Sequence, residues 1–215
     1  MKVLIIGGAG FIGINLINNF LKKKKYKIFV IDNLTYASNK KEISRLSKIK
    51  KINFFKVSIV DLIKIKKIIK FVKPDKIINF AAETHVDRSI ENSSSFIKTN
   101  ILGTSILLDC CLENIDKDIN EFKLLHISTD EVYGSLDRQG SFTEESPYNP
   151  SSPYSASKAA ADQLLKAFFR TYSSKIIIAN ACNNYGPRQL PEKFIPKIIF
   201  NILENKSIPL YGKGS

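Results

Sequence analysis

The stretch Gly7-Gly8-Ala9-Gly10-Phe11-Ile12-Gly13 decides the fold that this sequence predicts. A short run rich in Val and Ile, Lys2–Ile6, precedes it and is typical of a buried parallel strand. Apolar residues at helical spacing follow it across Phe11–Leu21. Its glycines at 7, 10 and 13 therefore occupy a tight turn between a strand and a helix. There the backbone can approach a pyrophosphate, and the helix N-terminus offers N–H groups to it.

An acidic residue stands where a dinucleotide site requires one. The apolar run Ile28–Ile31 predicts a second strand, and Asp32 ends it, 19 residues after Gly13. A carboxylate at this point accepts hydrogen bonds from the adenosine ribose and repels a 2′-phosphate. The glycine turn and Asp32 together predict a site for NAD in preference to NADP.

The remaining chain alternates strands and helices. This alternation predicts an α/β fold, a doubly wound parallel sheet with helices on both faces. We expect a surface loop over Gly134–Pro153, because this segment is rich in Pro, Ser, Gly and Asn. The further expected strands are Phe54–Ile59, Ile77–Ala81, Lys123–Ile127 and Ile176–Ala181, and the further helices are Leu62–Val72, Ser95–Glu113 and Ser155–Tyr172.

Composition excludes several classes of protein. The 215 residues carry a net charge of +13, but the lysines are spread along predicted helices, which favours a solvated surface over a nucleic-acid site. Two histidines far apart in sequence and three cysteines predict neither a metal site nor a disulfide framework. No apolar run approaches the ~18–20 residues of a membrane span, and no signal peptide is recognised, so we expect a cytoplasmic location.

A tyrosine and a lysine four residues apart form the predicted reaction centre. In Tyr154-Ser155-Ala156-Ser157-Lys158 both side chains share one face at the start of a predicted helix. A nearby ammonium favours the phenolate and so lowers the pKa of a tyrosine. Tyr154 could then take a proton from a sugar hydroxyl while a hydride leaves for nicotinamide.

These motifs resemble the extended short-chain dehydrogenases/reductases, whose third catalytic residue is a Ser or Thr, matched by Thr129. The triplet Thr129-Asp130-Glu131 is similar to that of the dTDP-glucose 4,6-dehydratases within this family. The resemblance implies NAD-dependent oxidation of dTDP-glucose at C4, with Glu131 as the base at C5 and Asp130 as the acid for the departing 6-hydroxyl. Hydride return to C6 would give a 4-keto-6-deoxy sugar for deoxysugar synthesis of the rhamnose type.

Further blocks of sequence carry the resemblance. Besides Tyr154 and Lys158, it implies cofactor contacts at Gly7, Gly10, Phe11, Ile12, Gly13, Asp32, Asn33, Leu34, Thr35, Ser58, Ile59, Phe80, Ala81, Ala82, Thr84, Thr99 and Asn184. It implies substrate contacts at Thr84, His85, Thr129, Asn183, Lys193, Phe194, Pro209 and Tyr211.

The chain departs from the family at four points, the mildest of which is Thr84, where the family usually has Ser. Ser58 stands where the family commonly has an Asp that contacts adenine, and Cys182 stands where Ser is usual. Family members also continue for about another third of their length. The sequence therefore predicts an NAD-binding domain with the catalytic residues over 1–182, and over 183–215 the start of a substrate lobe whose remainder is absent.

Three alternatives stay open at this point. One is another nucleotide-sugar enzyme of the same fold, such as an epimerase or a decarboxylase, which would not need the pair Asp130-Glu131. Another is an NAD-binding remnant without turnover. The least favoured is a nucleic-acid binder, suggested by charge alone. The resemblance also implies a homodimer that uses the helices Ser95–Glu113 and Ser155–Tyr172.

Overall fold

The computed structural model describes residues 1–215 apart from 24, 115–122, 137–139 and 209–215. In this described part, parallel strands form a sheet in the order β3-β2-β1-β4-β5-β6. This order is that of doubly wound dinucleotide-binding folds and confirms the predicted fold class. The strands are β1 (Lys2–Ile6), β2 (Lys27–Asp32), β3 (Ile52–Lys56), β4 (Lys76–Asn79), β5 (Lys123–Thr129) and β6 (Lys175–Ala181).

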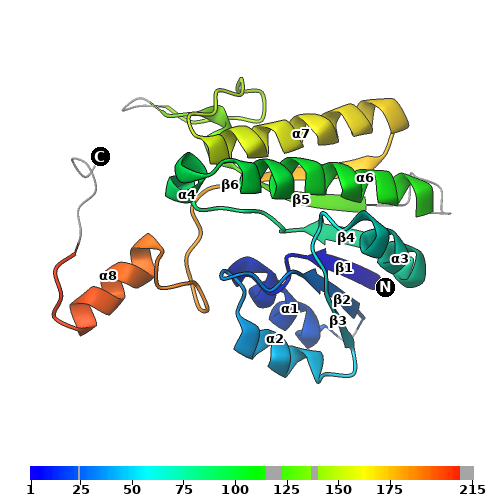
Figure 1. The fold of residues 1–215 in the computed structure, drawn as a ribbon, viewed down its shortest axis with the longest axis horizontal. Coiled ribbons are helices and arrows are strands. Elements are labelled where there is room, and N and C mark those ends of the chain that lie inside the picture. Colours follow the sequence, from blue (N-terminus) through cyan, green and yellow to red (C-terminus); the bar gives the residue numbers. More distant parts are fainter. Residues whose placement is uncertain (24, 115–122, 137–139, 209–215) are drawn as a thin grey trace. The chain divides into compact units, whose positions relative to one another are not determined.

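Helices cover both faces of the sheet (Figure 1). One face carries α3 (Leu62–Val72), α6 (Gly103–Asn114) and α7 (Pro153–Tyr172), and the other carries α1 (Phe11–Lys22) and α2 (Lys40–Ser47). The remaining helices are α4 (Val86–Glu91), α5 (Ser94–Phe96), the π-helical η1 (Ile97–Leu102), the 3₁₀-helical η2 (Asp130–Tyr133) and α8 (Phe194–Leu203).

Successive residues of the central strand serve two separate cores. Leu4 and Ile6 of β1 pack with α3, α6 and α7, whereas Val3 and Ile5 pack with α1 and α2. All four side chains are at most 1% exposed. Each contributes about 1.5–3 kcal/mol when it is fully buried. An apolar run with no polar alternation therefore forms this strand because both of its faces are covered.

Three predicted strand ends were wrong, and each error concerns the carboxyl edge of the sheet. β3 spans Ile52–Lys56 instead of Phe54–Ile59, because the chain turns where Asp61 N–H donates to the Ser58 carbonyl. β4 ends at Asn79 instead of Ala81, because the Asn79 side chain accepts a hydrogen bond from Ala81 N–H and replaces the ladder. β5 continues beyond Ile127 to Thr129, paired with β6 throughout.

The predicted helix Ser95–Glu113 is formed by three consecutive segments, α5, η1 and α6, of which the middle one is π-helical. By length and composition alone, Ser94–Glu113 could cross a membrane. Phe96, Leu107 and Leu108 of this stretch are buried, and the latter two belong to the core beside α3. The apolar character of the stretch is therefore that of a core helix.

The chain divides into two compact units, Met1–Cys182 and Asn183–Ser215. The first contains the whole sheet. The second contains α8, whose apolar side chains Ile199, Phe200, Ile202 and Leu203 are all more than half exposed.

Candidate functional site

The glycine turn fits tightly between β1 and its neighbours. Gly7 has a φ of +74°, and a Cβ there would lie 2.5 Å from the backbone nitrogen of Ala81. A Cβ on Gly13 would lie 2.7 Å from the Gly7 carbonyl oxygen. Gly8, which the spacing argument passed over, is as constrained, since its Cβ would lie 2.6 Å from Val30 Cγ1. These positions require glycine for packing.

Helix α1 begins directly after this turn without a side-chain cap. Gly10 occupies the N-cap position and has no side chain to offer, and the first helical N–H that bonds back is that of Ile14, to the Gly10 carbonyl. The N–H groups of the first turn and the positive end of the helix dipole are thus presented to an anion. Phe11, Ile12 and Gly13 form this turn.

Asp32 is buried and organises the loops at the end of β2. Its Oδ2 accepts a hydrogen bond from Ala9 N–H at 2.9 Å. Its Oδ1 accepts from Leu34 N–H and from Ser38 Oγ, both at 2.8 Å. A carboxylate has about four acceptor positions. Asp32 therefore fixes the glycine turn and the loop after β2 and keeps capacity for one further donor.

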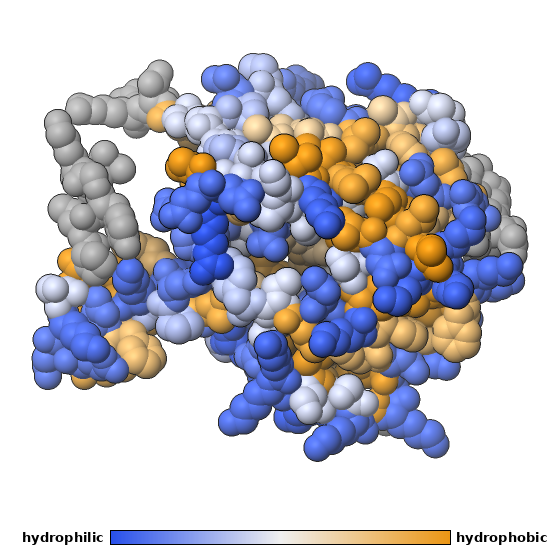
Figure 2. Space-filling view, in the orientation of Figure 1, coloured by the Kyte–Doolittle hydropathy of each residue, from blue (hydrophilic) through white to orange (hydrophobic). Residues whose placement is uncertain are grey.

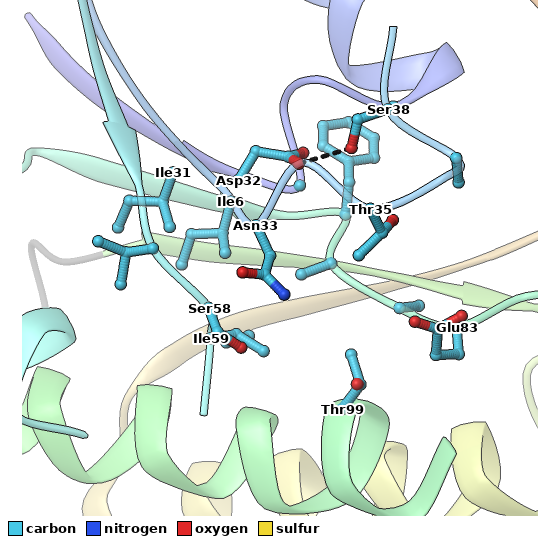
Figure 3. A pocket seen from close by; sticks show the side chains of 17 residues that line it. Ile6, Ile31, Asp32, Asn33, Thr35, Ser38, Ser58, Ile59, Glu83 and Thr99 are labelled. Carbon is cyan, nitrogen blue, oxygen red and sulfur yellow. Dashed lines mark hydrogen bonds between the residues drawn. The ribbon is translucent and has the colours of Figure 1, made fainter. Parts of the chain in front are cut away.

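A cleft opens at the carboxyl edge of the sheet, where Asp32, Ser58, Ile59 and Thr99 approach one another from different elements (Figure 3). It is lined by Ile6, Gly7, Gly10, Ile31, Asp32, Asn33, Thr35, Ala37, Ser38, Val57, Ser58, Ile59, Phe80, Ala81, Ala82, Glu83 and Thr99. Most residues predicted to contact the cofactor are therefore together. Those outside the lining are Phe11, Ile12, Gly13, Leu34, Thr84, Tyr154, Lys158 and Asn184.

Asn100 of η1 holds the loop after β4, and sequence reasoning missed it. Its Oδ1 accepts from Glu83 N–H at 2.8 Å, while its Nδ2 donates to the Glu83 carbonyl at 3.1 Å and to Ser157 Oγ at 2.8 Å. The side chain is 1% exposed. One buried amide thus joins η1, a cleft-lining residue and α7. A polar residue within an otherwise apolar predicted helix was the signal that could have found it.

Helix α7 begins two residues before the predicted start and fixes Tyr154 by its backbone. Ser152 caps the helix, accepting from Ser155 N–H, and Ser155 Oγ accepts from Ser152 N–H in return. Tyr154 N–H donates to Ser89 Oγ of α4 at 3.1 Å. The phenol ring stands edge-on to Phe96, with 6.4 Å between centroids. Tyr154 is 8% exposed and therefore well ordered by its surroundings.

The triplet Thr129-Asp130-Glu131 lies at the junction of β5 and η2, close to Tyr154. Thr129 Oγ1 accepts from Glu131 N–H at 3.2 Å and lies 3.3 Å from Asp130 Oδ1. Burial, followed by the charge of Glu131, raises the pKa of Tyr154 to about 12. A hydrogen bond with Thr129 opposes this rise. The four predicted catalytic groups at 129, 130, 131 and 154 are thus neighbours.

The expected lowering of the Tyr154 pKa by Lys158 was wrong for this structure. Lys158 is 2% exposed and turns inward, where Nζ donates to the Ile127 carbonyl at 2.7 Å and lies 3.1 Å from His126 Nε2. Burial lowers the pKa of Lys158 to about 8, and Asp162 opposes this. Burial and the two carboxylates of the triplet therefore dominate the pKa of the phenol.

The predicted substrate residues are spread over both units. Thr84 is exposed, and His85 precedes α4, with no hydrogen-bond partner for its buried Nδ1 among the described residues. In the second unit Asn183 and Phe194 are exposed and Lys193 is half-buried, while the carbonyl of Asn184 accepts from Gln189 Nε2. Pro209 and Tyr211 lie outside the described residues.

Comparison with known proteins assigns the family. The family model described as GDP-mannose 4,6 dehydratase matches residues 4–215. The chain belongs to this family. A dTDP-glucose 4,6-dehydratase of Salmonella typhimurium is 45% identical over 228 residues, which cover 100% of this chain and 63% of that protein. The chain thus spans less than two thirds of the length of the curated relatives it matches.

Solved structures of relatives agree with the family. The dTDP-glucose 4,6-dehydratase DesIV of Streptomyces venezuelae, crystallised with NAD, gives a TM-score of 0.91 at 42% identity over 100% of this chain and 66% of that one. A UDP-glucose 4-epimerase of Thermus thermophilus, in complex with NAD, gives 0.86 at 29% identity over 98% of this chain and 65% of that one. The fold is therefore shared with epimerases and does not by itself identify the reaction.

Proposed function

We propose that the chain acts as an NAD-dependent nucleotide-sugar 4,6-dehydratase with dTDP-glucose as its substrate. The observation that carries the proposal is the grouping of Thr129, Asp130 and Glu131 beside Tyr154 at the carboxyl end of β5. Relatives named dTDP-glucose 4,6-dehydratases, 45% identical to the chain, support the choice of sugar nucleotide.

The cleft fits NAD by several independent features. The turn at Gly7 leaves no room for a Cβ, and the uncapped start of α1 presents N–H groups to the pyrophosphate. The remaining acceptor capacity of Asp32 suits a ribose hydroxyl, and Ser58 and Ile59 suit the adenine ring. Bound NAD supplies a hydride acceptor for the sugar C4 and a hydride donor for C6.

Tyr154 takes the proton of the sugar 4-hydroxyl in this proposal. A phenol with a pKa of about 12 is a weak base at neutral pH, so Tyr154 must ionise further when the ligands are in place. The hydrogen bond with Thr129 favours the ionised form, and a positive charge near the phenol would favour it further. Thr129 thus positions the sugar hydroxyl and Tyr154 together.

Asp130 and Glu131 divide the elimination of water between them. Oxidation at C4 acidifies the C5 proton, which Glu131 removes, and Asp130 protonates the departing 6-hydroxyl. The two carboxylates differ in surroundings, since Asp130 Oδ1 faces Thr129 Oγ1, while the Glu131 charge raises the pKa of Tyr154 more than the Asp130 charge does. Neighbouring carboxyl groups in different surroundings can hold different protonation states.

The proposal also covers the substrate contacts, the oligomeric state of the chain and its location in the cell. The sugar nucleotide contacts Thr84, His85, Asn183, Lys193, Phe194, Pro209 and Tyr211. The cofactor contacts Asn184. The chain forms a homodimer, supported by apolar side chains exposed on η1 and α7. It works in the cytoplasm, which the thiol of buried Cys111 supports, since free cysteines are typical of reducing compartments.

The second candidate is a nucleotide-sugar 4-epimerase. The similarity to the Thermus thermophilus epimerase, with a TM-score of 0.86, favours it. An epimerase needs the tyrosine but no acid–base pair for elimination. The adjacent carboxyl groups of Asp130 and Glu131 therefore favour the dehydratase.

Incubation of the purified chain with NAD and dTDP-glucose tests the proposal. We expect a 4-keto-6-deoxy product, and its loss by at least about 100-fold in Glu131→Gln, because general base catalysis contributes about 10²–10⁴-fold. A C4 epimer formed without loss of water would replace the dehydratase by the epimerase. Binding of NAD with no conversion of the sugar would reduce the proposal to a cofactor-binding protein.

A further inference from the structure

A buried polar network beneath the site surrounds Lys158 and extends beyond the residues that the reaction uses. His126 of β5 is 1% exposed, and Asp162 of α7, one helical turn after Lys158, is fully buried. Ionisable side chains are almost never fully buried unless something holds them there. Neither His126 nor Asp162 lines the cleft. Their placement around the lysine therefore calls for an explanation.

The orientation of His126 follows from a chain of hydrogen bonds. Asn79 Oδ1 accepts from Ala81 N–H, so the Asn79 amide nitrogen is the atom that faces His126 Nδ1, at 3.2 Å. An amide NH₂ can only donate, and Nδ1 must therefore accept. A neutral imidazole that accepts at Nδ1 carries its proton on Nε2. Burial and the charge of Lys158 lower the pKa of His126 well below its usual value, in agreement with a neutral ring.

His126 Nε2 then presents a donor to Lys158 Nζ, 3.1 Å away. A neutral amine can accept this hydrogen bond with its lone pair and still donate to the Ile127 carbonyl at 2.7 Å. An ammonium has no lone pair, so its proton would face the imidazole N–H. His126 thus favours the neutral form of Lys158.

Asp162 favours the ammonium form of Lys158, which is the opposite of the effect of His126. Its Oδ2 lies within donor reach of Ser128 Oγ at 2.6 Å, Tyr148 OH at 3.1 Å and Asn180 Nδ2 at 3.4 Å. Burial raises the pKa of this carboxyl group, whereas the three donors and the charge of Lys158 favour its ionised form. Its Oδ1 accepts no hydrogen bond within the described residues and lies 3.9 Å from His126 Nε2. A buried negative charge at this place favours the ammonium form of Lys158, and its effect on the lysine is to raise the pKa.

The other titratable groups around this network are tyrosines and the acids of the site. Tyr133 of η2 and Tyr148 of the loop before α7 face Asp162, and burial and the Asp162 charge raise the pKa of both phenols, which keeps them neutral. Glu131, Asp130 and, more weakly, Asp162 raise the pKa of Tyr154. Asp162 is thus the acid whose charge raises the pKa of Lys158.

We propose that Asp162 and His126 are positioning residues that set the charge of Lys158 in opposite directions: the Asp162 carboxylate holds it as an ammonium, and the His126 Nε2–H donor favours the neutral amine. Neither residue lines the cofactor cleft, and the charge of Asp162 also raises the pKa of Tyr154 directly. The consequence for catalysis rests on the proposed function, in which a positive charge near Tyr154 would favour the ionised phenol.

Titration of the Lys158 ammonium by NMR tests the proposal directly, with ¹⁵N-labelled lysine and Lys158→Arg to assign the signal. Asp162→Asn keeps the shape and can still accept from Ser128 and Tyr148, and we expect it to lower the midpoint of Lys158 by about one pH unit or more. We expect His126→Phe to raise the midpoint. Asp109→Asn, which removes an exposed charge from α6, serves as the control with no shift.

Opposite shifts in Asp162→Asn and His126→Phe establish the proposal. An unchanged midpoint in both, or shifts in the same direction, overturns it and leaves both residues as packing. If Asp162→Asn does not fold, Ser128→Ala tests the proposal instead. This substitution removes the donor 2.6 Å from Asp162 Oδ2 and so disfavours the ionised form of Asp162. It must therefore lower the midpoint of Lys158, by a smaller amount than Asp162→Asn. Because this titration needs no turnover, an inactive wild-type chain counts against the proposed function alone. Where turnover is measured, Asp162→Asn moves the alkaline limb of the pH–rate profile to lower pH.

Discussion

The glycines of the turn are needed for different structural reasons, which the spacing pattern does not distinguish. Gly7 combines a φ of +74° with a Cβ position 2.5 Å from the backbone of Ala81. Gly10 has an ordinary φ of −73°, and its Cβ would meet only the Gly7 carbonyl oxygen, at 3.4 Å. The first glycine is required by the protein itself, whereas any requirement at the second comes from the ligand.

Gly7→Ala and Gly10→Ala should therefore separate stability from cofactor binding. We expect Gly7→Ala to lower the free energy of unfolding by about 2–4 kcal/mol, since it adds overpacking to backbone strain. Gly10→Ala should change it by less than about 1 kcal/mol while weakening NAD binding. Urea unfolding and NAD titration of both variants measure the two effects. Equal destabilisation by the two substitutions would contradict this account.

Tyr154 was found from sequence, but its ionisation was not. The motif fixed its place on α7, while burial and the charge of Glu131 come from elements distant in sequence and raise its pKa to about 12. A spacing of four residues shows only that two side chains share a helix face. It does not show that Lys158 turns toward His126 and the Ile127 carbonyl.

Glu131→Gln should lower the pKa of Tyr154 in the ligand-free chain. The carboxylate of Glu131 disfavours the phenolate, and its replacement by a neutral amide removes that repulsion. NMR titration of ¹³Cζ-labelled tyrosine, with Tyr154→Phe to assign the signal, measures the midpoint. Thr129→Val offers the matched control, because loss of a hydrogen bond that favours the phenolate must move the midpoint upward. A Tyr154 signal that ignores both substitutions would disprove the electrostatic coupling.

At the scale of elements, strongly periodic segments were predicted well and irregular ones were not. The helix Leu62–Val72 was predicted to the residue from its apolar spacing and the following Pro74, and the structure adds that Asp61 caps its start. Helix α2 was missed, since its eight residues bury only Ile43 and Leu46 and show too short a pattern. The π-helical η1 could not be predicted either, because its register depends on the tertiary bonds of Asn100. π-Helical turns are often found at functional sites, and this one presents Thr99 to the cleft.

Asn100→Ala should loosen the cleft as well as the fold. It leaves the Glu83 N–H and carbonyl groups without their partner, which costs about 1–3 kcal/mol for each buried group left unsatisfied. We expect a lower free energy of unfolding and weaker NAD binding, both measured by titration. Ser157→Ala, which removes one bond of Asn100 and leaves the Glu83 pair, should affect NAD binding less. Equal loss of NAD affinity in the two variants would place the effect in α7 instead of the loop.

At the scale of the whole molecule, the sheet order creates the site. Because β1 lies between β2 and β4, the segments that follow these strands meet at one edge, and the cleft gathers Gly7, Asp32 and Ala81 from them. The alternation of elements predicted a parallel sheet, and the rule that ligands bind where strand order reverses then gives the location. The strand-order rule does not extend past position 183, where the second unit begins, since the described residues of that unit, 183–208, contribute no strand to the sheet.

The proposed dimer is testable at this same scale, because the chain exposes apolar side chains on adjacent helices. Ile97 and Leu102 of η1 are 52% and 49% exposed, and Phe169 of α7 is 54% exposed. Figure 2 shows hydrophobic residues gathered over the region of α6 and α7.

Burying a phenylalanine side chain stabilises an interface by about 1.5–3 kcal/mol, and burying a carboxylate in its place costs more. We expect Phe169→Glu to raise the dimer dissociation constant by at least about tenfold in sedimentation equilibrium. Phe71→Glu is the matched control, since Phe71 is 73% exposed on α3, which belongs to neither η1 nor α7, and should leave association unchanged. A wild-type chain that sediments as a monomer, or a dimer weakened equally by both substitutions, would remove η1 and α7 as the interface.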